Sequence, residues 1–402
     1  MRTLILLLTS FLHSASVYSQ DVPSVSCLRV PDKGLQPRVA VGRNGTKHLV
    51  YFVGEPKAGN LIYRFQKEEP DGSWSAPLRV NSETNSAVAI GTIRGPQLAL
   101  GKSDQIHVAW NGSSKATPKG IGNPTVPKDS PHHFSAPMLY TRLNDVGDGF
   151  EEQRNLMTHT YALDGGGSVA ADRSGNVYVV WHANSKQSAG SKEADRAVYV
   201  AKSYNSGKTF SEETRINHGD TGACGCCGLQ AFCDSAGRLS VLYRTATNEV
   251  HRDMHLLYGA ESPQSTHTST LGSWNAAICV MSTASFCELG DTTFAAWETE
   301  NCIQFSVLNP SVELRSKRPR PWTSTVGRSP QKHPCLAVNK DGIVLLAWSE
   351  GTSWNNGGDI AWQLFDQDGN PIRRARGREK GLPAWSYPAA FSNADGSFTV
   401  LY

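Results

Sequence analysis

The chain has 402 residues, and its 39 Lys and Arg residues against 36 Asp and Glu residues give a net charge of +3. A charge this close to neutral argues against nucleic acid as a partner, since a nucleic-acid-binding domain carries a strong basic excess. The 37 Gly, 21 Pro and 10 Trp residues are typical of an all-β protein with many turns.

The first residues have the pattern of a secretory signal peptide. Arg2 supplies the positive charge, Thr3 to Leu12 form an apolar core, and the small residues at Ser16 and Ser19 offer a cleavage site. The apolar run is shorter than the ~20 residues that span a bilayer. We therefore expect residues 1–19 to be removed, and the mature protein to be secreted or periplasmic without stable membrane insertion.

A motif then repeats along the chain. A small residue or proline begins an apolar run, a turn with Asn-Gly, Asp-Gly or Ser-Gly follows in most copies, and a second apolar run ends in an aromatic residue. The seven copies begin at Pro37, Pro96, Ser168, Leu229, Ala276, Pro334 and Pro388. A repeat of this length cannot bury its own apolar face, so the copies must stack against one another.

Each copy predicts one blade of a β-propeller. The turns are hairpin signals, and a second pair of strands follows the first pair in most copies, which gives four short antiparallel strands. The last copy ends at Tyr402 without outer strands, and the strand-like segment Val25–Val30 is placed to pair with it and close the ring. We predict a single propeller domain over residues 20–402 with seven blades, or six if the fifth copy is not a true blade.

The nine cysteines are expected to form disulfides, because an exported protein meets oxidising conditions. An odd count leaves at least one cysteine unpaired. Cys224, Cys226 and Cys227 offer metal or redox chemistry as an alternative. Neighbouring Cys226 and Cys227 point in different directions from an extended chain, however, and no second ligand pair completes a zinc set. We therefore predict no metal and no cofactor.

Two segments stand outside the repeat. The insertion Asn111–Ala136 is rich in Pro, Gly, Ser and Lys, and loops of this length are usually functional or mobile. The basic run Arg373–Arg378 is expected to be a solvated loop.

The segment Ser203–Phe210 resembles the Asp-box, S-x-D-x-G-x-T-W, of sialidase-like propellers with BNR repeats, with Asn205 and Phe210 in place of the Asp and Trp. In that family the box stabilises a blade hairpin and takes no part in catalysis. The segment Cys224–Asp253 also resembles a sub-family of these propellers. The resemblance implies a propeller fold and says less about activity.

Sialidases hold the substrate carboxylate with three arginines and use a tyrosine nucleophile that a glutamate activates. By resemblance, Tyr387 takes the position of the nucleophile and Arg244 that of one clamp arginine. Arg328 precedes an inner strand, and Arg94 and Arg252 are further candidates for substrate binding.

Each of these residues also has a structural interpretation. No glutamate stands before Gly237, where the family carries the activating residue, and no convincing acid follows the first hairpin. Arg244 and Arg252 could pair with Asp253, Arg94 could face solvent, and Tyr387 could be an aromatic residue at a blade edge.

The leading function is therefore a sialidase-like glycoside hydrolase with an incomplete catalytic set, acting on glycans, anionic ones included, at the central face. The alternative is a non-catalytic propeller that binds glycan or protein through the long insertion and a set of tryptophans, and under either function we expect a monomer. Its candidate aromatic residues, which core packing explains better than sugar stacking does, are Trp110, Trp181, Trp297 and Trp348.

Overall fold

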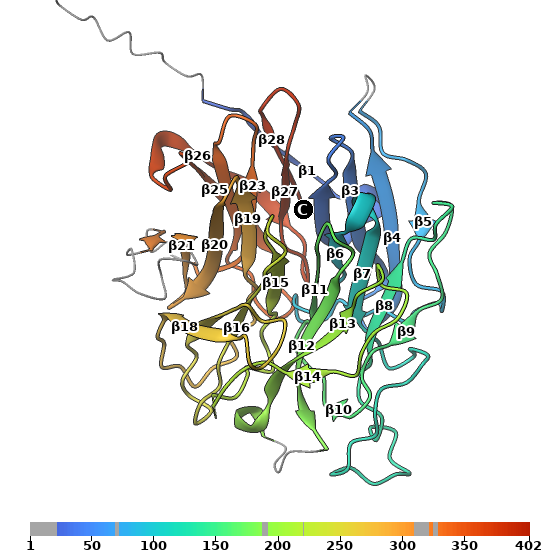
Figure 1. The fold of residues 1–402 in the computed structure, drawn as a ribbon. Helices are drawn as coiled ribbons and strands as arrows, with labels where there is room; N and C mark the ends of the chain where they lie inside the picture. Colours follow the sequence, from blue (N-terminus) through green and yellow to red (C-terminus); the bar gives the residue numbers. More distant parts are fainter. Residues whose placement is uncertain (1–21, 69–71, 187–191, 220, 309–320, 325–328) are drawn as a thin grey trace, which may run out of the picture.

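The computed structural model describes residues 22–68, 72–186, 192–219, 221–308, 321–324 and 329–402. These residues form an all-β propeller of seven sheets arranged round one axis, and the chain colours follow one another round the ring (Figure 1). The predicted fold and blade number are confirmed. The predicted signal peptide and Arg328 lie outside the described residues.

The first three blades are built from thirteen strands. Blade 1 contains β2 (Leu35–Val41), β3 (Lys47–Glu55), β4 (Ala58–Gln66) and β5 (Leu78–Arg79). Blade 2 contains β6 (Gln97–Leu100), β7 (Ile106–Asn111), β8 (Met138–Arg142) and β9 (Arg154–Asn155). Blade 3 contains β11 (Ser168–Ala171), β12 (Val177–Ser185), β13 (Ala197–Ser203) and β14 (Thr214–Arg215), with β10 (Thr160–Tyr161) beside the end of β12.

The next three blades have four strands each. Blade 4 contains β15 (Gln230–Cys233), β16 (Leu239–Arg244), β17 (Met254–Tyr258) and β18 (His267–Gly272). Blade 5 contains β19 (Ser285–Leu289), β20 (Thr292–Thr299), β21 (Cys302–Leu308) and β22 (Trp322–Thr323). Blade 6 contains β23 (Gln331–Val338), β24 (Val344–Glu350), β25 (Gly358–Phe365) and β26 (Pro371–Leu382).

Blade 7 joins the two ends of the described chain. It contains β27 (Ala389–Ser392), β28 (Phe398–Leu401) and the N-terminal β1 (Val25–Leu28), which pairs in parallel with β28 from Val25 opposite Phe398 to Leu28 opposite Leu401. Blue β1 therefore lies beside red β28 in Figure 1. Bonds on both sides of Tyr402 extend this pairing, because Val30 N donates to Tyr402 O at 2.9 Å and Tyr402 N donates to Leu28 O at 3.0 Å.

The first hairpin of a blade is held by a side chain at its turn. In blade 3 one carboxylate oxygen of Asp172 accepts bonds from the amides of Ser174, Gly175 and Asn176 at 2.8–2.9 Å. Gly175 has a φ of +101°, which a residue with a Cβ rarely adopts. The Ser-Gly turn of this blade, one of the repeated turn signals, therefore has a local physical cause.

The apolar core lies between neighbouring sheets. Trp181 of blade 3, for example, packs in one cluster with Met138 and Tyr140 of blade 2. Trp110, Trp181, Trp297 and Trp348 are all at most 6 % exposed, so these tryptophans fill the core and cannot stack on a sugar.

Two local expectations were wrong. The first strand of the fifth copy is β19, whereas residues 276–279 form no strand, because Ala276 N bonds to Val250 O of the preceding blade. The basic run Arg373–Arg378 is part of the outer strand β26 instead of a loop. An outer strand has a solvated face, so its sequence lacks the apolar run that indicates an inner strand. Among the described residues, no helix is long and apolar enough to cross a membrane.

The ring closure gives a first prediction. A chain that starts at Val30 loses β1 and about four backbone hydrogen bonds. Each of these bonds makes a net contribution of about 0.5–1.5 kcal/mol to the free energy of unfolding. We expect its thermal unfolding midpoint to fall clearly below that of a control chain that starts at Val22, as measured by circular dichroism. Equal midpoints would show that β1 does not close the ring.

Candidate functional site

One end of the ring, here called the top face, gathers the starts of the inner strands. In four blades a proline stands within the first four residues of the inner strand or directly before it, which suits an edge strand because proline has no amide to donate. Together with the residues that precede them, these prolines are Gln36-Pro37, Gly95-Pro96, His333-Pro334 and Tyr387-Pro388. Residues distant in sequence therefore meet round the axis at this face.

Gln36 links three blades at the top face. Its amide nitrogen donates to Ser386 Oγ at 3.1 Å, and its side-chain Nε2 donates to Trp385 O at 2.8 Å and also to Ala89 O. Gln36 is fully buried and has a φ of +52°. These contacts fix blades 7, 1 and 2 relative to one another.

Tyr387 lies buried in this ring with 1 % of its surface exposed. The guanidinium of Arg38 lies 4.9 Å from the centre of its ring, and the His333 ring lies at 5.6 Å. Burial raises the pKa of Tyr387 and lowers that of His333 to about 3, so both side chains are neutral at physiological pH. The predicted nucleophile therefore sits beside an arginine, but beneath the surface.

Arg244 and Glu298 also lie buried beside each other and are joined through the backbone carbonyl of Glu298. Arg244 Nη1 donates to Arg252 O at 2.8 Å and Nη2 donates to Glu298 O at 2.5 Å, while the guanidinium lies 5.3 Å from the Trp274 ring. The Glu298 side chain is completely buried at the end of β20. Burial raises the pKa of this carboxyl to about 7, although the positive charges of Arg244 and Lys332 oppose the shift.

Arg94 pairs with a carboxylate from the next blade. Its Nη2 lies 2.5 Å from Asp164 Oδ1, its Nε donates to Asp164 O at 2.6 Å, and its Nη1 donates to Ile90 O at 2.8 Å. The Asp164 side chain is 46 % exposed and that of Arg94 is 16 % exposed. This is an ion pair that a ligand can reach from solvent.

A cavity of about 330 Å³ adjoins this ion pair; we call it the Arg94 groove. Most of its wall is apolar, and polar groups of Lys57, Asn111, Ser113 and Ser114 contribute the rest. Asn111 is itself fixed, since its Nδ2 donates to Gly165 O at 2.9 Å. Both ends of the insertion 111–136 contribute to the wall, so this insertion shapes the groove.

An exposed aromatic ring stands next to the groove. Trp354, in the loop after β24 of blade 6, is 47 % exposed. Gly91 lies between this ring and the Arg94 guanidinium. A Cβ placed on Gly91 would lie 3.1 Å from the Trp354 ring and 2.7 Å from Arg94 Nη1. Blades 2, 3 and 6 thus meet at one place on the top face.

The ionic partner of Arg252 is Glu193, at 2.8 Å between Nη2 and Oε2. Asp253, the partner considered from the sequence, instead accepts a bond from the Trp274 amide at 2.9 Å. The structure brings Arg244 and Arg252 together, whereas Arg94 and Tyr387 have separate partners. Arg328, the remaining candidate, is not among the described residues.

Sequence reasoning missed several residues of this face: Arg38, Asp164, Glu298 and Trp354. Two of them carried a signal, because Arg38 and Glu298 are charged residues inside otherwise apolar strand segments. The fold of the propeller brings the partner of such a charged residue from a distant part of the sequence, as it brings Asp164 to Arg94.

The axis itself holds a narrow channel. Its cavity of about 290 Å³ is lined by the inner strands of all seven blades, mostly through small and apolar residues. Arg38, Gln97 and Gln230 add polar groups to the wall of this channel.

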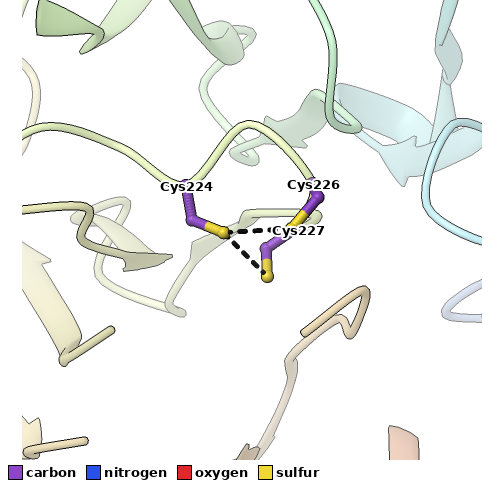
Figure 2. Close-up of side chains that lie close together, drawn as sticks. All are labelled: Cys224, Cys226 and Cys227. Atoms are coloured by element: carbon purple, nitrogen blue, oxygen red, sulfur yellow. Dashed lines mark hydrogen bonds between the residues drawn. The ribbon is translucent and has the colours of Figure 1, made fainter. Parts of the chain in front are cut away.

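The cysteines form no disulfide in the structure, and all nine lie within the described residues. Disulfides, expected from the sequence, are therefore not found. Three of the nine, Cys224, Cys226 and Cys227, form a cluster whose sulfur atoms all lie within 4.8 Å of one another (Figure 2). The cluster stands at the top face directly before β15.

Comparisons with known proteins bear on the fold alone. No protein-family model and no curated protein sequence matches the chain. Similar solved structures include a protein of unknown function from Dyadobacter fermentans, with a TM-score of 0.53 and 12 % identity over 90 % of this chain and 98 % of that one. The α-L-arabinanase of Penicillium chrysogenum, in complex with arabinobiose, has a TM-score of 0.51 and 12 % identity over 86 % and 97 %. A Trypanosoma rangeli sialidase has a TM-score of 0.50 and 9 % identity over 80 % and 53 %.

Glu298 gives a prediction on pH. Its folded-state pKa of about 7 lies above the ordinary value of 4.5, so between these pH values the folded protein keeps a proton that the unfolded chain releases. The stability from this carboxyl is fully present below about pH 4.5 and is lost as the pH rises through about 7. Relative to Glu298→Gln, the protein should lose about 3 kcal/mol of unfolding free energy across this window.

Urea denaturation at a series of pH values measures this loss. Glu300→Gln, an exposed glutamate two residues away, is the control and should leave the pH profile unchanged. A profile for Glu298→Gln that runs parallel to that of the unchanged protein would contradict the raised pKa.

Proposed function

We propose that this propeller binds glycans at the Arg94 groove. The observation that carries the proposal is the exposed Trp354 ring beside the solvent-accessible Arg94–Asp164 pair. Carbohydrate sites combine an aromatic face for the sugar ring with a few fixed polar groups for the hydroxyls, and the groove offers both.

The wall chemistry supports this use. The Arg94 guanidinium is held by three acceptors, so its orientation is set before a ligand arrives. Asp164 can accept hydrogen bonds, and the Arg94 guanidinium keeps N–H donors beyond its three bonds, which matches hydroxyl groups that both donate and accept. Lys57 is exposed at the rim and supplies a positive charge for a carboxylated sugar.

Binding of oligosaccharides tests the proposal. On a glycan array that carries neutral and acidic sugars, the protein should retain a defined group of glycans, and isothermal titration with the best of them should give a measurable Kd. Trp354→Ala and Arg94→Ala should each weaken binding about 10-fold or more, since a stacking or charged contact contributes about 1–3 kcal/mol.

Tyr204→Ala is the matched control, because Tyr204 is an aromatic residue that is 69 % exposed and lies outside the groove. Its binding should equal that of the unchanged protein. If neither Trp354→Ala nor Arg94→Ala weakens binding, the ligand binds elsewhere and the proposal is refuted.

Hydrolysis of a sialoside is a second candidate. It is favoured by the Arg38 guanidinium over the Tyr387 ring and by the Glu298 carboxyl with its pKa near 7, a value suited to proton transfer. Against it, the Tyr387 and Glu298 side chains lie beneath the surface, so substrate would have to displace the covering residues.

A fluorogenic sialoside separates the two candidates. If the chain is a hydrolase, Tyr387→Phe should abolish turnover while Tyr63→Phe, a change at another buried tyrosine, leaves it intact. If the unchanged protein binds glycans but releases no fluorophore, hydrolysis is excluded and glycan binding is the function.

Membership of the sialidase-like BNR family and export belong to the same proposal. The turn Ser203–Phe210 supports the first, because Ser203 Oγ accepts from Gly207 N at 2.9 Å and Asn205 Oδ1 accepts from Thr209 N at 2.9 Å. Phe210 packs edge-on against Tyr140 at 4.7 Å. Export is supported by the apolar run from Thr3 to Leu12, and N-terminal sequencing of the secreted protein would test cleavage after Ser19.

A further inference from the structure

The turn Cys224–Cys227 brings three thiols together at the top face. Cys224 Sγ lies 3.4 Å from Cys226 Sγ and 3.4 Å from Cys227 Sγ, and Figure 2 shows all three sulfurs directed into one space. Cys224 and Cys227 are buried, and Cys226 is partly exposed. Three of four consecutive residues therefore place the same kind of ligand atom, a thiol sulfur, close to one point.

The distances favour a metal ion over a disulfide. Sulfurs that share one ion at about 2.3 Å lie about 3.8–4.0 Å apart, so the observed 3.4 Å spacing needs to widen by only about 0.5 Å. A disulfide needs about 2.05 Å, a closure of more than 1.3 Å. Moreover, Cys224 is equidistant from its two neighbours, and one disulfide would leave the third thiol alone.

The turn is held in place by the blades on either side of it, blade 3 and blade 5, before any ligand binds. Gly225 N donates to Glu193 Oε1 at 2.5 Å, Cys227 O accepts from His182 Nε2 at 3.0 Å, and Gly228 N donates to Ser282 O at 3.0 Å. A Cβ on Gly225 would lie 3.1 Å from Asp164 Oδ2, so the close approach of this turn suits glycine. The sulfurs are therefore preorganised by contacts that do not involve them.

The surroundings compensate for negative charge. Arg252 acts electrostatically on Cys224 and Cys226, and Arg244 acts on Cys227. Arg252 is only 5 % exposed, and its Nε and Nη1 have no hydrogen-bond partner, although its Nη2 pairs with Glu193. Three thiolates with a monovalent cation leave two negative charges; Arg244 offsets one of them, and Arg252 offsets the other in part because it also pairs with Glu193.

The ligand set and its wall favour Cu(I). Within the described part of the chain, no His, Asp or Glu joins the three sulfurs as a fourth ligand at this spacing. The side chains packed against the cluster are the apolar Trp274 and Val280. Cu(I) prefers soft thiolate ligands, whereas a structural Zn²⁺ site takes four.

We propose that Cys224, Cys226 and Cys227 form a trithiolate site for one Cu(I) ion at the top face of the propeller. The site adjoins the Arg94 groove, because Gly225 lies next to Asp164, but its existence does not depend on the glycan proposal. Binding releases the thiol protons, and each sulfur then donates to the same ion.

The test is a Cu(I) titration of the reduced, full-length protein under anaerobic conditions, in competition with a chromogenic Cu(I) chelator. We expect one Cu(I) per chain, with a new ultraviolet thiolate-to-copper band. Cys224→Ser and Cys226→Ser should each weaken the affinity more than about 100-fold, since loss of an outer contact alone costs about 10–100-fold. Cys279→Ser, at an exposed thiol outside the cluster, is the matched control.

Circular dichroism without metal shows whether each variant is folded, so a loss of copper can be assigned to the missing ligand. Uptake of one Cu(I) that depends on Cys224 and Cys226 but not on Cys279 supports the site. No uptake by the reduced protein, uptake that persists in the folded Cys224→Ser variant, or tight binding of Zn²⁺ in preference to Cu(I) would each overturn it.

Discussion

The structure depends on one constraint: a four-stranded sheet of this size has two faces to cover and cannot cover either by itself. Each blade buries one face against the blade before it and the other against the blade after it, as Trp181 does with Tyr140. Only a closed ring satisfies every blade, and closure requires the two ends of the chain to share a sheet. The parallel pairing of β1 with β28 meets that requirement.

Closure of the propeller also explains why the candidate functional residues lie together at the top face. Every inner strand begins at the top face, so the residues just before these strands converge there from all parts of the sequence. Gln36, Tyr387 and Glu298 are buried polar groups that a small hydrophobic core would not tolerate unless partners compensated for them. Around them lie the Arg94 groove and the cysteine cluster, both placed by loops that cross from one blade to the next.

The fold was predictable because its signals are local. A short turn between two apolar runs indicates a hairpin within about fifteen residues, and seven such pairs of apolar runs indicate seven blades. Where the local signal was weak, the prediction failed: β19 follows an irregular segment, and the solvated outer strand β26 has no apolar run. The site was less predictable, since Arg94 owes its orientation to Asp164, 70 residues away, and Trp354 reaches the groove from blade 6. The sulfur cluster was visible in the sequence, but its geometry depends on His182 and Ser282 of neighbouring blades.

The central claim is that ligands are recognised on the top face beside Arg94. A crystal structure of the protein soaked with the best glycan from an array tests this most directly. The account predicts a sugar ring stacked on Trp354, with its hydroxyls bonded to Arg94 and Asp164. Sugar density in the axial channel or on the outer strands, with the Arg94 groove empty, would contradict it.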